Sequence, residues 1–119
     1  MKNIVISLFF LFNFVFAFSQ TKEDYKKALD LITKGFNEKN ASLIHQKFTP
    51  DLKKELQENT FKKTIDSLHT DKGAMSTYEL IMEEEKEKNY LVEFENGSML
   101  ILIHLSPTGE ISMLKIKDY

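Results

Sequence analysis

The 119-residue sequence contains no cysteine, no tryptophan and no arginine, so every strongly basic side chain is a lysine. Without cysteine the chain can form neither a disulfide nor a thiolate metal site, and it has no cysteine nucleophile. The formal net charge is −2. Arginine is the usual side chain for binding phosphate and reading bases, so this composition argues against a nucleic-acid partner. Glycines are few and isolated, which excludes phosphate loops and dinucleotide fingerprints; they are Gly35, Gly73, Gly97 and Gly109.

The aromatic residues are concentrated at the start of the chain, where an apolar run extends over residues 4–18 after Lys2. Ala17 and Ser19 place small residues at positions −3 and −1 of a possible cleavage site. This layout is typical of a secretory signal peptide, and the run is shorter than the roughly 20 residues of a spanning helix. We therefore predict a signal peptide over residues 1–19 and a secreted or periplasmic product. An uncleaved anchor is the alternative, and it would be the chain's only link to a membrane.

Residues 20–119 contain no repeat or linker and are expected to form a single domain. Its first segment, from Lys22 to about Asn37, has an apolar stripe with the spacing of one helix face. The stripe consists of Tyr25, Ala28, Leu29, Ile32 and Phe36. Gly35 lies within it, and we interpret this glycine as local fraying near the helix end. The alternative is the close approach of another element.

Three shorter helices are expected to follow, each after a residue that can cap a helix. Asn40 precedes the first, and Thr49 with Pro50 begins the second. Asn59 or Thr60 is the expected cap of the third.

From residue 74 onward the apolar residues alternate as they do in strands. Strands are expected over residues 75–83, 90–95, 99–105 and 111–117, and Asn96-Gly97 is a strong hairpin signal. The sequence therefore predicts an α+β fold, with N-terminal helices packed on a curved, mainly antiparallel sheet of about four strands.

This order of elements carries a family resemblance through Phe36, Phe48, Thr49-Pro50-Asp51-Leu52, Gly73 and the closing segment 109–114. It resembles the nuclear-transport-factor-like superfamily, the cystatin-like α+β cones, and within it small bacterial secreted domains of unknown function. The resemblance implies a conical pocket between the sheet and the helices. Members of the superfamily include enzymes, ligand binders and accessory domains. Some of the small secreted domains precede a hydrolase domain, and that hydrolase activity is not carried over to this chain.

The three histidines do not stand at metal-binding spacings, so we predict no metal site and no cofactor. His45 is expected to be solvated, and His69 is expected in the last turn of a helix, where it suits the negative helix end. His104 lies in the most apolar strand and is interpreted as a core or interface residue. Its alternative role is acid–base chemistry in a pocket.

Glutamates could act as general bases only from the inner face of the sheet. Glu79, Glu93 and Glu95 alternate with far more apolar residues, so they are expected outside. The leading hypothesis is therefore a non-catalytic binding or assembly domain, acting through the cone pocket or the outer sheet face. The alternative is a small enzyme of the isomerase or dehydratase type that uses His104. Tyr25, Tyr78 and His104 are the pocket candidates, with a small apolar molecule as the expected ligand.

The strand over residues 99–105 is apolar on both faces, whereas a sheet covered on one face should alternate. One row is Met99/Ile101/Ile103/Leu105 and the other is Leu100/Leu102/His104. Only one of them can pack on the helices, and an exposed apolar row favours a partner. We therefore predict a homodimer or a protein partner at this strand, with Leu100, Leu102 and His104 as interface candidates. The alternative is a sheet that curls enough to bury both rows within one chain.

Overall fold

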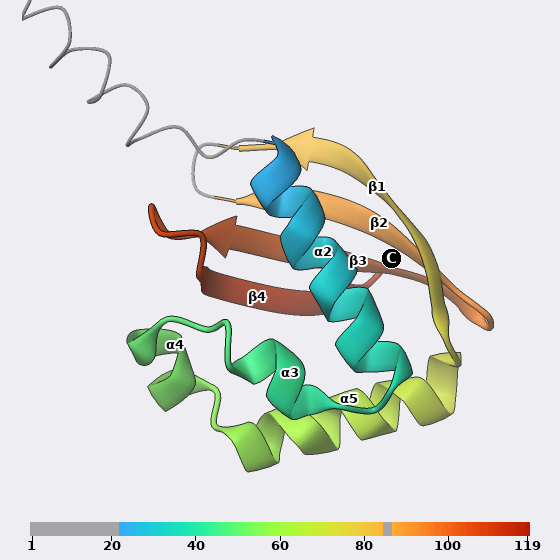
Figure 1. The fold of residues 1–119 in the computed structure, drawn as a ribbon. Coiled ribbons are helices and arrows are strands. Elements are labelled where there is room, and N and C mark those ends of the chain that lie inside the picture. Colours follow the sequence, from blue (N-terminus) through green and yellow to red (C-terminus); the bar gives the residue numbers. More distant parts are fainter. Residues whose placement is uncertain (1–21, 85–86) are drawn as a thin grey trace, which may run out of the picture.

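The computed structural model describes residues 22–84 and 87–119, and it confirms the α+β fold (Figure 1). In this part of the chain four helices precede four strands. The helices are α2 (Lys22–Asn37), α3 (Ala41–His45), α4 (Pro50–Glu55) and α5 (Glu58–Lys72). The strands are β1 (Met75–Glu83), β2 (Lys88–Phe94), β3 (Gly97–Leu105) and β4 (Ile111–Asp118). The predicted signal peptide, residues 1–19, lies outside the described residues.

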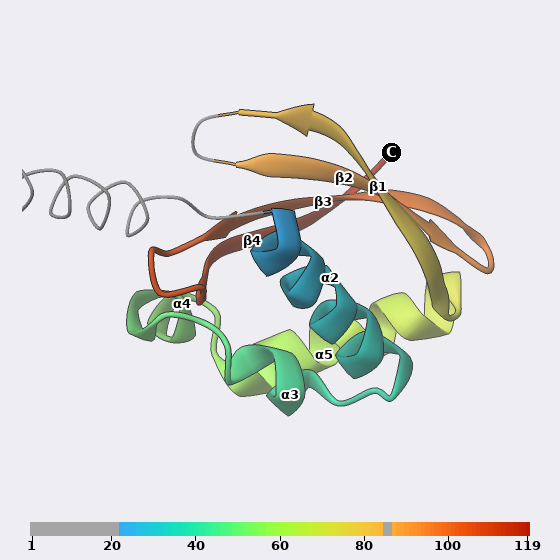
Figure 2. The same ribbon diagram turned by 45° about the horizontal axis from the view of Figure 1, so that its top comes forward.

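The strands form one open antiparallel sheet in the order β1-β2-β3-β4, so neighbours in the chain are neighbours in the sheet. Figure 2 shows the helices together beneath one side of the curved sheet. We call this side the inner face and the opposite side the outer face. Strand β1 is irregular, with register shifts between Met75 and Thr77 and between Leu80 and Met82.

Helix α2 buries the predicted stripe, together with Gly35. The interpretation of Gly35 as a fraying position is wrong, because α3 approaches the helix closely there. A Cβ atom added to Gly35 would lie 2.6 Å from Cγ1 of Ile44. The absence of a side chain at residue 35 therefore allows the two helices to pack.

The short helices begin as their capping residues predict. The Oδ1 atom of Asn40 accepts a hydrogen bond from the Leu43 amide, and Oγ1 of Thr49 accepts one from the Leu52 amide. Helix α5 differs from the prediction, since it begins at Glu58 with Gln57 as its N-cap and no side-chain capping bond. Neither Asn59 nor Thr60 is its cap.

The core lies between the helices and the inner face. Apolar side chains of α2, α3 and α5 meet the inner residues of β2 and β3, among which Val92, Ile101 and Ile103 are fully buried. Phe36 packs edge-on against Phe94 with a centroid distance of 5.2 Å. No polar or charged residue of the described chain is buried. The helices are thus held mainly by apolar contact.

Two polar links connect the helices to the sheet across long stretches of sequence. The side-chain amide of Asn37 makes two hydrogen bonds with the backbone of Met75. Its Oδ1 atom accepts from the Met75 N–H at 2.7 Å, and its Nδ2 atom donates to the Met75 carbonyl at 2.9 Å. At the start of β4, the N–H of Ile111 donates to the Lys47 carbonyl, and the carbonyl of Ile111 accepts from the Thr49 N–H. Residues 47–49 therefore extend the sheet beside the start of β4.

Two histidines have structural roles. The expectation of a solvated His45 is wrong, because its Nε2 atom lies 2.9 Å from the Leu56 carbonyl and its ring packs near Phe48. His69 is in the last turn of α5, as predicted, and its ring lies 5.4 Å from that of Phe36.

Candidate functional site

The structure decides which row of β3 packs on the helices. Met99, Ile101, Ile103 and Leu105 belong to the core. The row of Leu100, Leu102 and His104 therefore points to the outer face. No helix of residues 22–84 or 87–119 lies over that face (Figure 2). Even so, Leu102 is only 7% exposed, and Leu100 is half-buried.

The strand register places the outer side chains in two rows that cross the whole sheet. From β1 to β4, the first row is Glu79, Leu91, Leu100 and Lys117. The second row is Met82, Asn89, Leu102 and Lys115. The middle of the outer face is therefore mainly apolar, while β4 contributes lysines and β1 contributes a glutamate.

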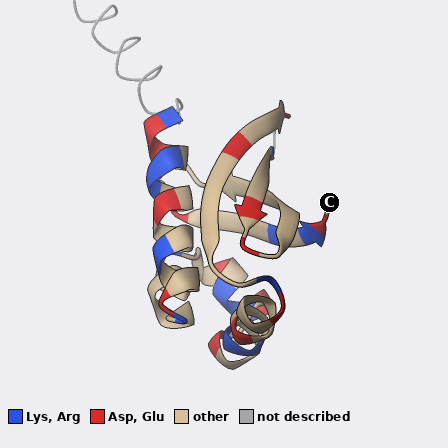
Figure 3. Ribbon diagram, turned by 90° about the vertical axis from the view of Figure 1, so that its right-hand side faces the viewer, with Lys and Arg blue, Asp and Glu red and all other residues tan. Residues whose placement is uncertain are grey.

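Charge is segregated across this face. Figure 3 shows the lysines of β4 as a blue band beside the C-terminus, with acidic bands on strands farther across the sheet. Glu79, Lys115 and Lys117 are exposed, and none makes an ion pair within the described chain. Glu93 also faces outward, as expected, and its Oε2 atom accepts a hydrogen bond from the Ser98 hydroxyl. The unpaired charges at the two edges remain available to a second molecule.

Tyr25 and Tyr78 lie together in a pocket of about 310 Å³, which we call the tyrosine pocket. Its other lining residues are Lys22, Lys26, Leu80, Lys88 and Tyr90. The Tyr25 hydroxyl accepts the buried Leu105 N–H at 3.2 Å, and the Tyr78 hydroxyl donates to Asp30 at 2.7 Å. Both hydroxyls therefore take part in hydrogen bonds of the fold.

Two of the tyrosines that line the tyrosine pocket have raised pKa values. Burial, followed by the hydrogen bond to Asp30, raises the pKa of Tyr78 to about 12. Burial is also the main cause that raises the pKa of Tyr90 to about 12. The amine of Lys88 lies 4.7 Å from the centre of the Tyr25 ring and pairs with Glu83. Because both tyrosines stay protonated at neutral pH, neither serves as a general base.

His104 is not brought to the two tyrosines. Its side chain lies on the outer face, in register with Met113 of β4, whereas Tyr25 and Tyr78 lie on the helix side. The Nδ1 atom of His104 is shielded from solvent and has no hydrogen-bond partner among the described residues. The three pocket candidates thus belong to two separate places in the fold.

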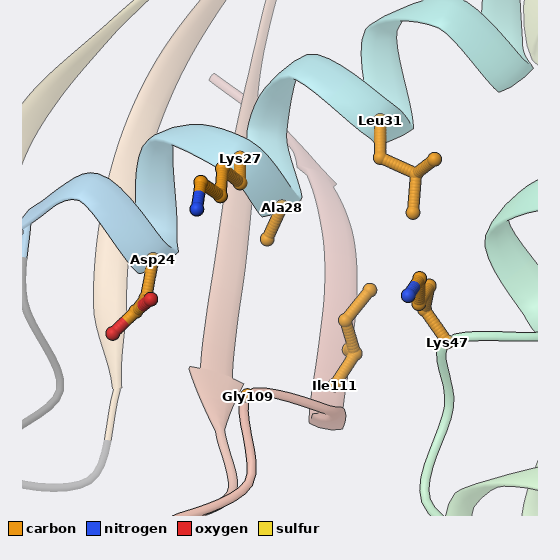
Figure 4. Close-up of a pocket in the computed structure, with 7 residues that line it drawn as sticks. All are labelled: Asp24, Lys27, Ala28, Leu31, Lys47, Gly109 and Ile111. Carbon is orange, nitrogen blue, oxygen red and sulfur yellow. The ribbon is translucent and has the colours of Figure 1, made fainter.

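Sequence reasoning missed a second pocket, of about 220 Å³, between α2 and the β3–β4 turn (Figure 4). It brings together Asp24, Lys27, Ala28, Leu31, Lys47, Gly109 and Ile111. These residues come from three distant segments, and no motif connects them. The backbone pairing of residues 47–49 with Ile111 places Lys47 beside the start of β4. Its two lysines and one aspartate do not define a ligand.

Within residues 22–84 and 87–119, no group of histidine and carboxylate side chains is arranged to hold a metal ion. In the same residues, no helix combines the length and apolarity needed to cross a membrane.

Comparison with protein-family models, with curated proteins and with solved structures finds no match. The resemblance to the cystatin-like cones therefore stays a prediction, and the function must be inferred from the chain's own residues.

Proposed function

We propose that the chain is an exported, non-catalytic assembly domain that binds protein through the outer face of its sheet. The observation that carries this proposal is the apolar centre of that face, where the half-buried side chains of Leu91 and Leu100 lie beside buried Leu102 and no described helix covers them. Uncovered apolar surface that spans several strands is typical of an interaction surface. The charged residues at its edges suit the polar rim of an interface.

The absence of cysteine allows a direct test, because an introduced thiol is then the only one in the chain. Lys115→Cys places it on the outer face, and Lys54→Cys places a matched thiol on exposed α4. Maleimide labelling is measured in cell extract containing the exported protein and again in a dilute purified sample. We expect residue 115 to label at least several-fold more slowly in the extract, with no change at residue 54. Equal labelling of residue 115 in the two samples would contradict the proposal.

Export is tested by the mass of the protein recovered from the periplasm or medium. The junction at Ser19 predicts a mature product that begins at Gln20. A product that retains residues 1–19 would show an anchor instead.

Binding of a small apolar molecule in the tyrosine pocket is a second candidate function. Three of the four tyrosines line this pocket, together with the exposed side chain of Leu80. Since there is no tryptophan, tyrosine emission reports largely on the pocket. We expect cyclohexanol to change that emission in the parent chain and in Leu102→Lys, but not in Leu80→Lys. An unchanged emission in the parent chain would remove this candidate.

The enzyme hypothesis places His104, or Tyr25 and Tyr78, in the cavity, and His104 lies on the opposite face of the sheet from the tyrosine pocket. We propose no catalytic residue. An isomerase or dehydratase turnover that His104→Gln abolishes would overturn the non-catalytic proposal.

A further inference from the structure

We infer that the outer face binds a second copy of this chain, related by a two-fold axis that runs parallel to the strands between β2 and β3. This inference rests on the proposed function, since it names the partner of the same surface.

The outer rows are complementary to themselves under this rotation. A two-fold axis along the strands exchanges the two edges of the sheet and keeps each row at its own level. Glu79 of one copy then lies over Lys117 of the other, and Leu91 lies over Leu100. Every contact occurs twice, as an isologous interface requires. In this row, unlike charges meet at both edges and leucines meet at the centre.

The second row fits the same rotation. It places Met82 beneath Lys115 of the other copy and Asn89 beneath Leu102. Met82 is 52% exposed, and the aliphatic stem of a lysine can cover such a side chain while its amine stays in water. The lysine at this edge therefore contacts an apolar residue rather than another lysine.

The other two-fold axis in the plane of the interface runs across the strands, and the charges disfavour it. That rotation places each edge strand over its own copy, so the lysines of β4 face the lysines of the other β4, and no lysine of β4 faces Glu79. Like charges facing each other destabilise an interface and suppress wrong arrangements. The segregation of charge therefore selects the axis parallel to the strands. Sheets stacked this way pack in the aligned manner, at a crossing angle of about −30°.

The size of the face suits a weak dimer. Four strands about 4.8 Å apart, each of seven to nine residues at about 3.3 Å per residue, give a face of roughly 19 by 23–30 Å. Two such faces together cover about 900–1,100 Å², close to the lower limit of specific interfaces.

The test reverses the charges of the first row. Glu79→Lys and Lys117→Glu each bring like charges together twice per dimer, and each should raise the dissociation constant about tenfold or more. The double variant restores unlike pairs and should return it to within about threefold of the parent value. Residues 79 and 117 are three strands apart, roughly 14 Å, and are separated by more than the Debye length of about 8 Å. Recovery in the double variant is therefore an intermolecular effect.

Sedimentation equilibrium of the exported chain and the three variants measures the four constants. Glu38→Lys, at an exposed position beyond the end of α2, is the matched control and should leave the constant unchanged. Far-ultraviolet circular dichroism checks that each variant is folded. The parent chain could dimerise while the double variant has a dissociation constant as high as those of the single variants. That result would overturn the two-fold axis parallel to the strands and leave the outer face as the proposed surface.

If the chain stays monomeric up to a concentration of about 1 mM, the inference that the partner is a second copy of this chain is wrong. Labelling of Lys115→Cys then identifies what covers the face. Protection in the purified monomer would point to a segment of the same chain, and protection in extract alone would point to a different protein. Absence of protection in both would overturn the proposed function as well.

Discussion

Replacing Gly35 with alanine tests the packing of α2 against α3. An added Cβ would lie 2.6 Å from Cγ1 and 2.9 Å from Cδ1 of Ile44, and 3.1 Å from the Asn40 carbonyl oxygen. Carbon atoms in favourable contact are about 3.5–4.0 Å apart, so the helices would have to separate. Overpacking of this kind costs about 1–3 kcal/mol, whereas alanine gains at most about 1 kcal/mol of helix propensity over glycine. We expect a net loss of about 1 kcal/mol in the free energy of unfolding.

Urea unfolding followed by circular dichroism measures this loss, and the same substitution in an Ile44→Ala background is the control. Ile44→Ala alone should cost about 2–5 kcal/mol because the side chain is fully buried. With both Cγ1 and Cδ1 removed, only the 3.1 Å approach to the Asn40 carbonyl oxygen remains, and Gly35→Ala should then cost less than in the parent chain or stabilise the variant by up to about 1 kcal/mol. If Gly35→Ala instead stabilises the parent chain, the close approach of the two helices is refuted.

Three further outcomes follow from the tyrosines. Tyr25→Phe removes the acceptor of the buried Leu105 N–H and should cost about 1–2 kcal/mol in urea unfolding; an unchanged midpoint would refute the importance of this bond. The hydrogen bond from Tyr78, followed by that from Lys26, lowers the pKa of the Asp30 carboxyl in the folded chain. The ionised carboxylate should therefore stabilise the fold above the unfolded-state pKa of about 4, and this stabilisation should be lost as the pH falls through the lower folded-state pKa. Asp30→Asn should flatten that part of a stability–pH curve, and an identical slope would contradict the pairing. Because the pKa of Tyr78 is raised to about 12, its effect is present below pH 10 and lost between about pH 10 and 12, which phenolate absorbance can follow.

The sequence predicted those elements whose signals are local. The stripe of α2 and the caps at Asn40 and Thr49 depend on residues three or four positions apart, and the structure reproduces them. The hairpin at Asn96-Gly97 connects β2 to β3 as predicted, because the two central residues determine the turn.

The misjudged residues are those whose partners are distant in sequence. His45 looks exposed within its own helix, yet its partner is the carbonyl of Leu56. Gly35 looks like a weak point of α2 until α3 is placed beside it. The face of His104 could not be chosen from a strand that is apolar on both sides. It follows only from the contacts of its neighbours Ile103 and Leu105 with the core.

The edges of the sheet determine whether assembly can propagate. An edge strand with free backbone groups can add further strands and grow into a filament. Here β1 is interrupted by two register shifts, and the start of β4 is already paired with residues 47–49. Strand addition is therefore hindered at both edges, while the broad outer face stays open. Association of this chain should thus end in a closed particle of defined size, rather than continue into fibres.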